Sequence, residues 1–83
     1  WLGKNIKYPT IAQENGVQGR VIVQFVVTKE GNIEEPVVAN GVDPYLDAEA
    51  LRLIKEMPKW KPGKQRGKEV NVKYTLPIHF RLQ

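Results

Sequence analysis

The clearest hydrophobic pattern in the chain lies near its C-terminus. From Val70 to Leu82, apolar and non-apolar residues alternate without a break. The apolar positions are Val70, Val72, Tyr74, Leu76, Ile78, Phe80 and Leu82. Strict alternation predicts a β-strand that turns one face to a core and the other to water.

Two further strands are predicted earlier in the chain. Residues 19–28 place four large apolar side chains on one face, and their other face is half apolar, which indicates a central strand. A turn at residues 29–32 follows, in which Gly31 supplies a positive φ, and a second strand covers residues 33–40. Pro36 cannot donate a ladder hydrogen bond, so this strand is expected at a sheet edge or a bulge.

The spacing changes to a helical period after residue 43. One apolar stripe is formed by Leu46, Ala50, Leu53, Ile54 and Met57. Asp43 or Asp47 can cap this helix, and Pro58 ends it at the preceding residue. A shorter helix is predicted from Pro9 through residues 10–16, because Pro suits the first helical position and Asn15-Gly16 is a good C-terminal stop.

The elements therefore follow the order α-β-β-α-β, which is typical of an α+β fold. A right-handed crossover makes the third strand parallel to the second. If the third strand lies beside the first, all neighbours are antiparallel. The sequence thus predicts a three-stranded antiparallel sheet of order 2-1-3 with two helices packed on one face. Pro36 and Pro77 would then both lie on outer strands.

Length and composition predict one domain over residues 1–83, because 83 residues can enclose a single core. The chain has no cysteine, so neither disulfides nor a thiolate metal site can stabilise it. No stretch approaches the roughly 18 apolar residues of a membrane span. The chain begins with Trp1 rather than Met, so we expect it to be a fragment of a longer protein.

Residues suited to catalysis are sparse. His79 is the only histidine, and it falls on the polar face of the last strand. Most acidic residues fall in turns or on the outer face of a helix, and these are expected to be solvated: Glu30, Glu34, Glu35, Asp43, Asp47, Glu49, Glu56 and Glu69. The sequence therefore predicts no enzyme, no metal site and no cofactor.

Positive charge is concentrated in one segment. The net charge is +4, and five cations lie between residues 59 and 68 without an acid among them. Such a segment could bind nucleic acid, an anionic envelope surface or an acidic partner. Trp60 could stack on a base or on a peptidoglycan sugar, although an aromatic just after an amphipathic helix more often packs against the sheet.

Several short motifs occur together in a recognisable order. They are Lys7-Tyr8-Pro9, Val17-Gln18-Gly19, Asp47-Ala48-Glu49-Ala50, Pro58-Lys59-Trp60-Lys61-Pro62-Gly63 and Tyr74-Thr75-Leu76-Pro77-Ile78. In these motifs the chain resembles the TonB C-terminal domain family from about residue 6 to residue 82. The detailed sequence of these motifs is similar to that of the TonB-like energy transducers of Bacteroidetes.

The resemblance implies a function in transport. Domains of this family lie in the periplasm and capture the TonB box of outer-membrane transporters as an added β-strand. The inner-membrane proteins ExbB and ExbD drive the other end of the parent protein, which is anchored in the inner membrane. The accepting strand corresponds to residues 70–78, with Tyr8 and Pro9 nearby. The candidate partner-binding residues are Val70, Asn71, Val72, Lys73, Tyr74, Thr75, Leu76, Tyr8 and Pro9.

The backbone of this strand can be analysed further. Pro77 has no N–H and is best placed where that group would face solvent. Its odd-numbered companions Asn71, Lys73 and Thr75 should then offer free backbone groups, while Val72, Tyr74 and Leu76 pair inward. Lys73 and Arg81 can also protect the edge against aggregation, and the two roles are compatible.

Two other partner classes remain. A nucleic-acid-binding module is disfavoured, because the predicted strands place Phe25, Tyr74 and Phe80 on the buried face, whereas RNA-binding sheets expose their stacking rings. We therefore expect no nucleic-acid partner. Peptidoglycan binding is the other alternative. Exposed edges also permit a homodimer formed by strand exchange.

Overall fold

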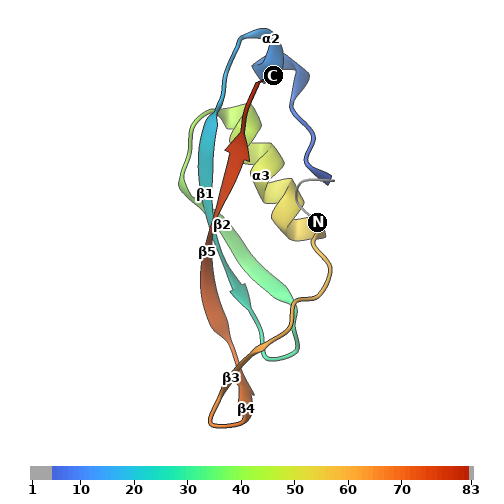
Figure 1. Cartoon of the computed structure of the whole chain (residues 1–83), viewed down its shortest axis with the longest axis vertical. Helices are drawn as coiled ribbons and strands as arrows, with labels where there is room; N and C mark the ends of the chain where they lie inside the picture. The colour runs from blue at the N-terminus through green and yellow to red at the C-terminus, as the bar shows by residue number, and fades with distance from the viewer. Residues whose placement is uncertain (1–4, 83) are drawn as a thin grey trace.

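A computed structural model describes residues 5–82 of the chain. Its sheet contains β1 (Gly19–Val27), β2 (Ile33–Asn40) and β5 (Val72–Phe80) in the order β2-β1-β5, and both neighbouring pairs are antiparallel. Helix α3 (Pro44–Glu56) lies against this sheet, and the short helix α2 (Thr10–Glu14) lies at the end of the sheet beside the C-terminus, where it contacts α3 (Figure 1). The predicted α+β fold and the strand order 2-1-3 are confirmed.

The turn between β1 and β2 has the predicted form. Gly31 adopts a φ of 86°, and its N–H donates to the Thr28 carbonyl at 2.8 Å. The Thr28 N–H donates to the Asn32 carbonyl, also at 2.8 Å, which closes the hairpin. Farther along β2, the register with β1 is irregular beside Glu35, which has a φ of 53°. Pro36 thus lies at an irregularity on an edge strand, as the sequence predicts.

Helix α3 begins and ends at the expected positions. The Asp43 carboxylate accepts the N–H groups of Tyr45 and Leu46, so Asp43 is the N-cap. Asp47 accepts the Val42 N–H at 3.0 Å instead and stabilises the preceding loop. The helix ends at Glu56, because Met57, which precedes Pro58, has extended backbone angles.

The start of α2 differs by one position from the prediction. Pro9 lies at the N-cap with φ −58° and ψ 130°, rather than at the first helical position. Its carbonyl accepts the Gln13 N–H at 2.9 Å, so it still begins the first helical turn. The helix ends at Glu14 with Asn15 as its C-cap and Gly16 at a φ of 68°, so the predicted Asn15-Gly16 stop is confirmed.

The last strand is shorter than predicted. Residues 63–70 form a separate hairpin of β3 (Gly63–Gln65) and β4 (Lys68–Val70), in which Gly63 pairs with Val70. Arg66 and Gly67 both have positive φ, at 53° and 77°, which makes a two-residue hairpin turn. The predicted strand 70–82 was therefore wrong at both ends, since β5 begins at Val72 and ends at Phe80.

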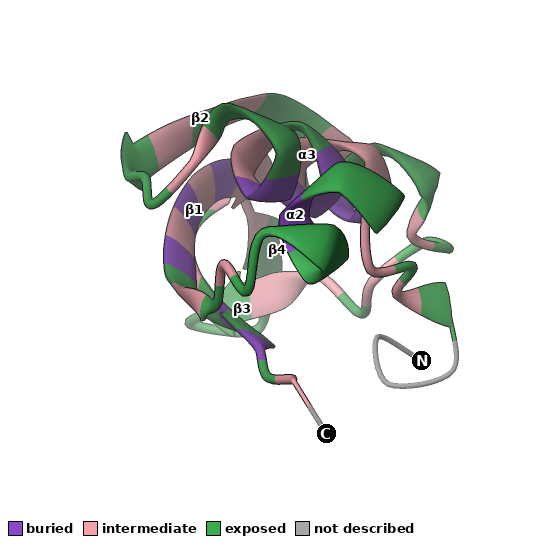
Figure 2. Ribbon diagram, turned by 90° about the horizontal axis from the view of Figure 1, so that it is seen from above, coloured by how far each residue is buried: buried purple, intermediate pink, exposed green. Residues whose placement is uncertain are grey.

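The core lies between the sheet and the helices. Its buried residues are Ala12, Val21, Val23, Phe25, Val27, Leu46, Ala50, Leu53, Ile54, Ile78 and Phe80. In Figure 2 buried positions alternate with half-buried ones along β1, and further buried positions lie on α3. Among residues 5–82 no helix covers the opposite face of the sheet, and this leaves one edge and one face of β5 accessible.

Candidate functional site

Strand β5 forms one edge of the sheet. Among residues 5–82 it pairs with β1 alone, through nine consecutive residue pairs from Gly19–Phe80 to Val27–Val72. Its other side carries no strand in the described part of the chain. A nine-residue edge with unpaired N–H and C=O groups is a template on which a further strand can pair.

The register indicates which backbone groups face outward. Pro77 lies opposite Ile22, and because proline has no N–H these two residues cannot exchange two hydrogen bonds. In a regular antiparallel ladder every second residue pair exchanges two hydrogen bonds, and the β1–β5 register is uninterrupted. The pairs of Thr75 and Lys73, two and four residues before Pro77, are therefore of the same kind as the Pro77 pair. The outward direction of the Lys73 and Thr75 backbone groups stays a prediction, and the register is compatible with it.

The side chains of β5 divide between the two faces of the sheet. Val72, Tyr74 and Leu76 are half-buried on the helix side, whereas Lys73 and Thr75 are exposed. A partner strand would therefore meet mainly backbone at this edge, and the half-buried apolar side chains would lie beneath it.

An aromatic cluster supports the first half of β5. The Tyr74 ring stacks on Phe25 with 6.1 Å between centroids, and Trp60 contacts Phe25 at 5.4 Å and Tyr74 at 5.1 Å. Trp60 is half-buried against the core, so its predicted packing against the sheet is confirmed. The cluster joins the central strand, the edge strand and the segment that leads into β3.

Tyr8 is placed at the other end of β5. Its ring meets the Phe80 ring edge-on with 5.7 Å between centroids, and its hydroxyl donates to the Val17 carbonyl. Tyr8 and Pro9 therefore lie near the end of β5 rather than near Val70. The predicted site residues thus divide into two groups that lie toward opposite ends of one strand.

Asn71 and Val70 lie outside β5. The Asn71 side-chain oxygen accepts the Lys29 N–H at 2.8 Å, which ties the start of β5 to the turn after β1. Val70 belongs to β4 and pairs with Gly63. Both residues position the edge, and their predicted contact with a partner remains untested.

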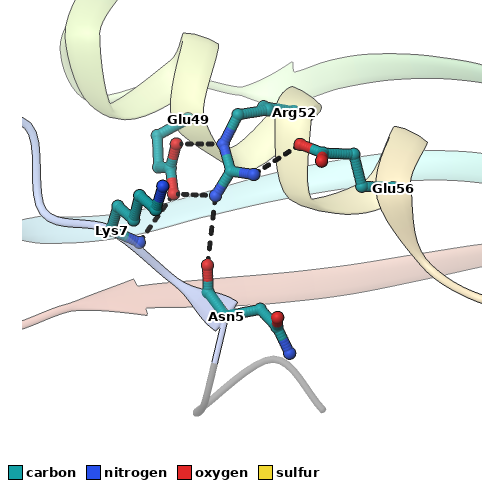
Figure 3. A network of polar contacts seen from close by, with 5 residues as sticks. All are labelled: Asn5, Lys7, Glu49, Arg52 and Glu56. Carbon is teal, nitrogen blue, oxygen red and sulfur yellow. Dashed lines mark hydrogen bonds and ion pairs between the residues drawn. The ribbon is translucent and has the colours of Figure 1, made fainter.

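A polar network that the sequence did not reveal fixes the N-terminal segment to α3 (Figure 3). Glu49 is only 9% exposed, so its predicted solvation was wrong. Its carboxylate accepts three hydrogen bonds, each of 2.7 Å. The donors are the Nε and a terminal nitrogen of the Arg52 guanidinium group and the backbone N–H of Lys7. Arg52 also contacts the Glu56 carboxylate and donates to the Asn5 carbonyl at 3.1 Å.

The network shifts the pKa of Glu49 and the pKa of Arg52. Hydrogen bonds from Arg52 hold the pKa of Glu49 below its ordinary value, the Lys7 N–H acts in the same direction, and burial opposes them. The two carboxylates, Glu49 first and then Glu56, raise the pKa of Arg52. A clue was present in the sequence, because Glu49 lies three residues after Leu46 and four before Leu53, on the buried face of the helix.

We expect Glu49→Gln to lower the free energy of unfolding at pH 7 by about 1–2 kcal/mol, because a charged acceptor of three hydrogen bonds is lost. Since the folded pKa is depressed, this contribution is present above the unfolded pKa and is lost as pH falls through the folded pKa. Urea unfolding at pH 7 and about pH 3 should show the difference shrinking in acid. The exposed Glu34→Gln is the control, and an equal loss in both variants would contradict the assignment.

The described residues offer neither a metal-binding cluster nor a membrane-spanning helix. Residues 5–82 contain no group of three or more His, Cys, Asp or Glu side chains arranged to hold a metal ion. Within the same residues, every helix is too short or too polar to cross a membrane.

Comparison with known sequences identifies the family. Residues 4–82 match the sequence model described as Gram-negative bacterial TonB protein C-terminal. The chain belongs to this family. It is 31% identical over 78 residues to Protein TonB of Vibrio cholerae and 32% identical over 78 residues to Protein TonB of Pseudomonas aeruginosa. These matches cover 93% and 92% of this chain, but only 32% and 22% of the relatives.

Solved structures agree with the fold. Two NMR structures of the Helicobacter pylori TonB C-terminal domain superpose with TM-scores of 0.75 and 0.72. The first is 24% identical and covers 99% of this chain and 74% of that domain fragment. The second is 26% identical and covers 96% and 84%.

Proposed function

We propose that this chain is the periplasmic partner-binding domain of a TonB-like energy transducer. In this proposal residues 1–83 form one domain that captures the TonB box of outer-membrane transporters. The parent protein is anchored in the inner membrane, and its other end works with ExbB and ExbD to couple proton-motive force to import. Membership of the TonB C-terminal family supports the assignment, and the unpaired edge of β5 is the observation that carries the mechanism.

Strand addition fits the chemistry of this edge. The TonB box would lie beside residues 72–76 and form around four to six backbone hydrogen bonds, each contributing roughly 0.5–1.5 kcal/mol before ordering costs. Affinity for an isolated peptide is therefore expected to be weak. Lys73 is exposed beside this path and can attract acidic residues of the partner. The mechanism requires no catalytic group and no cofactor.

The rival assignment to nucleic acid is less well supported by the structure. Phe25 and Phe80 are each 1% exposed, and Tyr74 and Trp60 are held in the aromatic cluster. These rings pack in the core or against it, whereas proteins that bind single-stranded nucleic acid stack the bases on aromatic rings at an exposed surface.

Thr75→Pro tests the proposal. We expect it to weaken binding of a synthetic TonB-box peptide at least about tenfold, because proline removes an outward N–H and its ring obstructs the edge. Thr75→Val, which keeps the N–H, should bind like the original chain. Affinity is measured by fluorescence anisotropy, and circular dichroism checks that the fold is retained. Equal peptide affinity for a folded Thr75→Pro variant would rule out strand addition at this edge.

A further inference from the structure

The net charge of the chain resides in one segment, residues 59–70, which we call the basic hairpin. It contains five cations, Lys59, Lys61, Lys64, Arg66 and Lys68, and one acid, Glu69. These charges sum to +4, which equals the formal net charge of the whole chain. The other residues therefore carry equal numbers of positive and negative charges. The molecule is therefore electrostatically polarised, with one cationic end.

The basic hairpin lies at one extreme of an elongated molecule. The principal extents are 49 × 23 × 17 Å, and β3 and β4 form the tip at one end of the long axis (Figure 1). All five cations are exposed, and in the described part of the chain the ion pairs found involve Arg52 instead. The cations are thus free to meet an external anionic surface.

The arrangement of the tip disfavours a groove for a peptide. Lys64 pairs across the ribbon with Glu69, and Gln65 pairs with Lys68, so the two lysines point to opposite faces of the hairpin. Residues 64–69 include no apolar side chain, and Trp60 is held in the aromatic cluster. The tip is a convex, polar and cationic projection without a stacking ring.

Arg66 provides a second, independent observation. It has a φ of 53° at the first central position of the turn, a conformation that Asn or Gly adopts at a lower free-energy cost. A long cationic side chain is therefore kept at the outermost point of the hairpin in an unfavourable backbone conformation. Strained positions of this kind occur preferentially where a side chain has a function.

We propose that the basic hairpin docks end-on against an anionic membrane surface, where Lys64, Arg66 and Lys68 contact phospholipid headgroups. A convex tip with cations on both faces fits a broad anionic layer better than a single acidic peptide. End-on docking also leaves the side edge of β5 accessible. The proposal does not depend on strand addition, because it concerns a different surface.

Vesicle co-sedimentation of the 83-residue chain tests this inference. We expect binding to vesicles of equal parts phosphatidylglycerol and phosphatidylcholine, and little binding to phosphatidylcholine alone. Raising the salt from about 0.05 M to about 0.5 M should release the chain, because the screening length falls several-fold. Equal binding to both kinds of vesicle, or binding unaffected by salt, would overturn the proposal.

Matched triple variants locate the surface. Lys64→Gln, Arg66→Gln and Lys68→Gln together should weaken binding about 100-fold, because each cation near an anionic surface contributes about fivefold. The control removes three exposed cations away from the hairpin, with Arg20→Gln, Lys55→Gln and Arg81→Gln, and should lose less than about fivefold. Equal losses in the two triples would show that only net charge matters and would reject a specific docking tip.

Single substitutions at residue 66 separate charge from turn geometry. Arg66→Asn suits the turn better, so it should preserve or raise stability while weakening vesicle binding about fivefold. Arg66→Lys should bind as the original chain does. Poly-L-glutamate and a DNA oligonucleotide are tested in parallel by anisotropy. Tight binding to either polymer without binding to anionic vesicles would assign the hairpin to that partner and refute membrane docking.

Discussion

Replacing Phe25 with alanine is expected to lower the free energy of unfolding by about 3–5 kcal/mol. The Phe25 side chain is 1% exposed, and its ring contacts both Trp60 and Tyr74. Its removal leaves a cavity beneath the start of β5 that a sheet cannot readily close. A domain of this size has a total stability of roughly 5–15 kcal/mol, so the loss is a large part of the whole.

Urea unfolding followed by circular dichroism measures this effect. Val26→Ala is the matched control, because Val26 is the next residue of β1 but is only half-buried and lies on the face without helices. We expect the control to lose less than about 1 kcal/mol. Similar losses for Phe25→Ala and Val26→Ala would mean that the aromatic cluster does not anchor β5.

The main elements of the fold could be predicted because their signals are local. The period-two pattern of β1 and the helical stripe of α3 follow directly from which face each element buries. The strand order could be predicted because Pro36 and Pro77 both suit outer strands. The ends of the last strand were missed because alternation continues through Val70, and it cannot show that residues 63–70 pair with one another.

The polar network was missed for a different reason. Glu49 accepts the N–H of Lys7, which is 42 residues away in the chain, and no sequence pattern gives the position of that segment. A glutamate on a buried helical face is a clue to burial, but its partners depend on the tertiary fold. Burial of Glu49 becomes favourable only because Arg52 and the N-terminal backbone supply donors to it.

The candidate edge was partly predictable. The alternation of residues 72–80 and the position of Pro77 indicated an outer strand, and the structure places β5 at the sheet edge. The supporting contacts were not predictable, because the Tyr8 hydroxyl reaches the Val17 carbonyl and the Asn71 side chain reaches Lys29 through the fold alone. Sequence reasoning therefore identified the strand and the packing of Trp60 against the sheet, but not the hydrogen bonds that hold the ends of the strand in place.

Replacing Gly31 with alanine should destabilise the chain by about 2–5 kcal/mol. A positive φ of 86° costs a residue with a side chain about 1–2 kcal/mol. In addition, a Cβ atom at residue 31 would lie 2.4 Å from the Trp60 backbone oxygen, and such overlaps cost about 1–3 kcal/mol. The Trp60 N–H also donates to the Gly31 carbonyl at 2.9 Å, so the two segments cannot separate without losing this bond.

Gly67→Ala is the control that carries the backbone-angle cost alone. Gly67 also has a positive φ, of 77°, but a Cβ atom there would meet nothing within 4 Å. We therefore expect this control to lose only about 1–2 kcal/mol. The excess loss in Gly31→Ala measures the contact with the Trp60 backbone. Equal losses in the two variants would show that Gly31 is required for its backbone angle alone and does not position the aromatic cluster beneath β5.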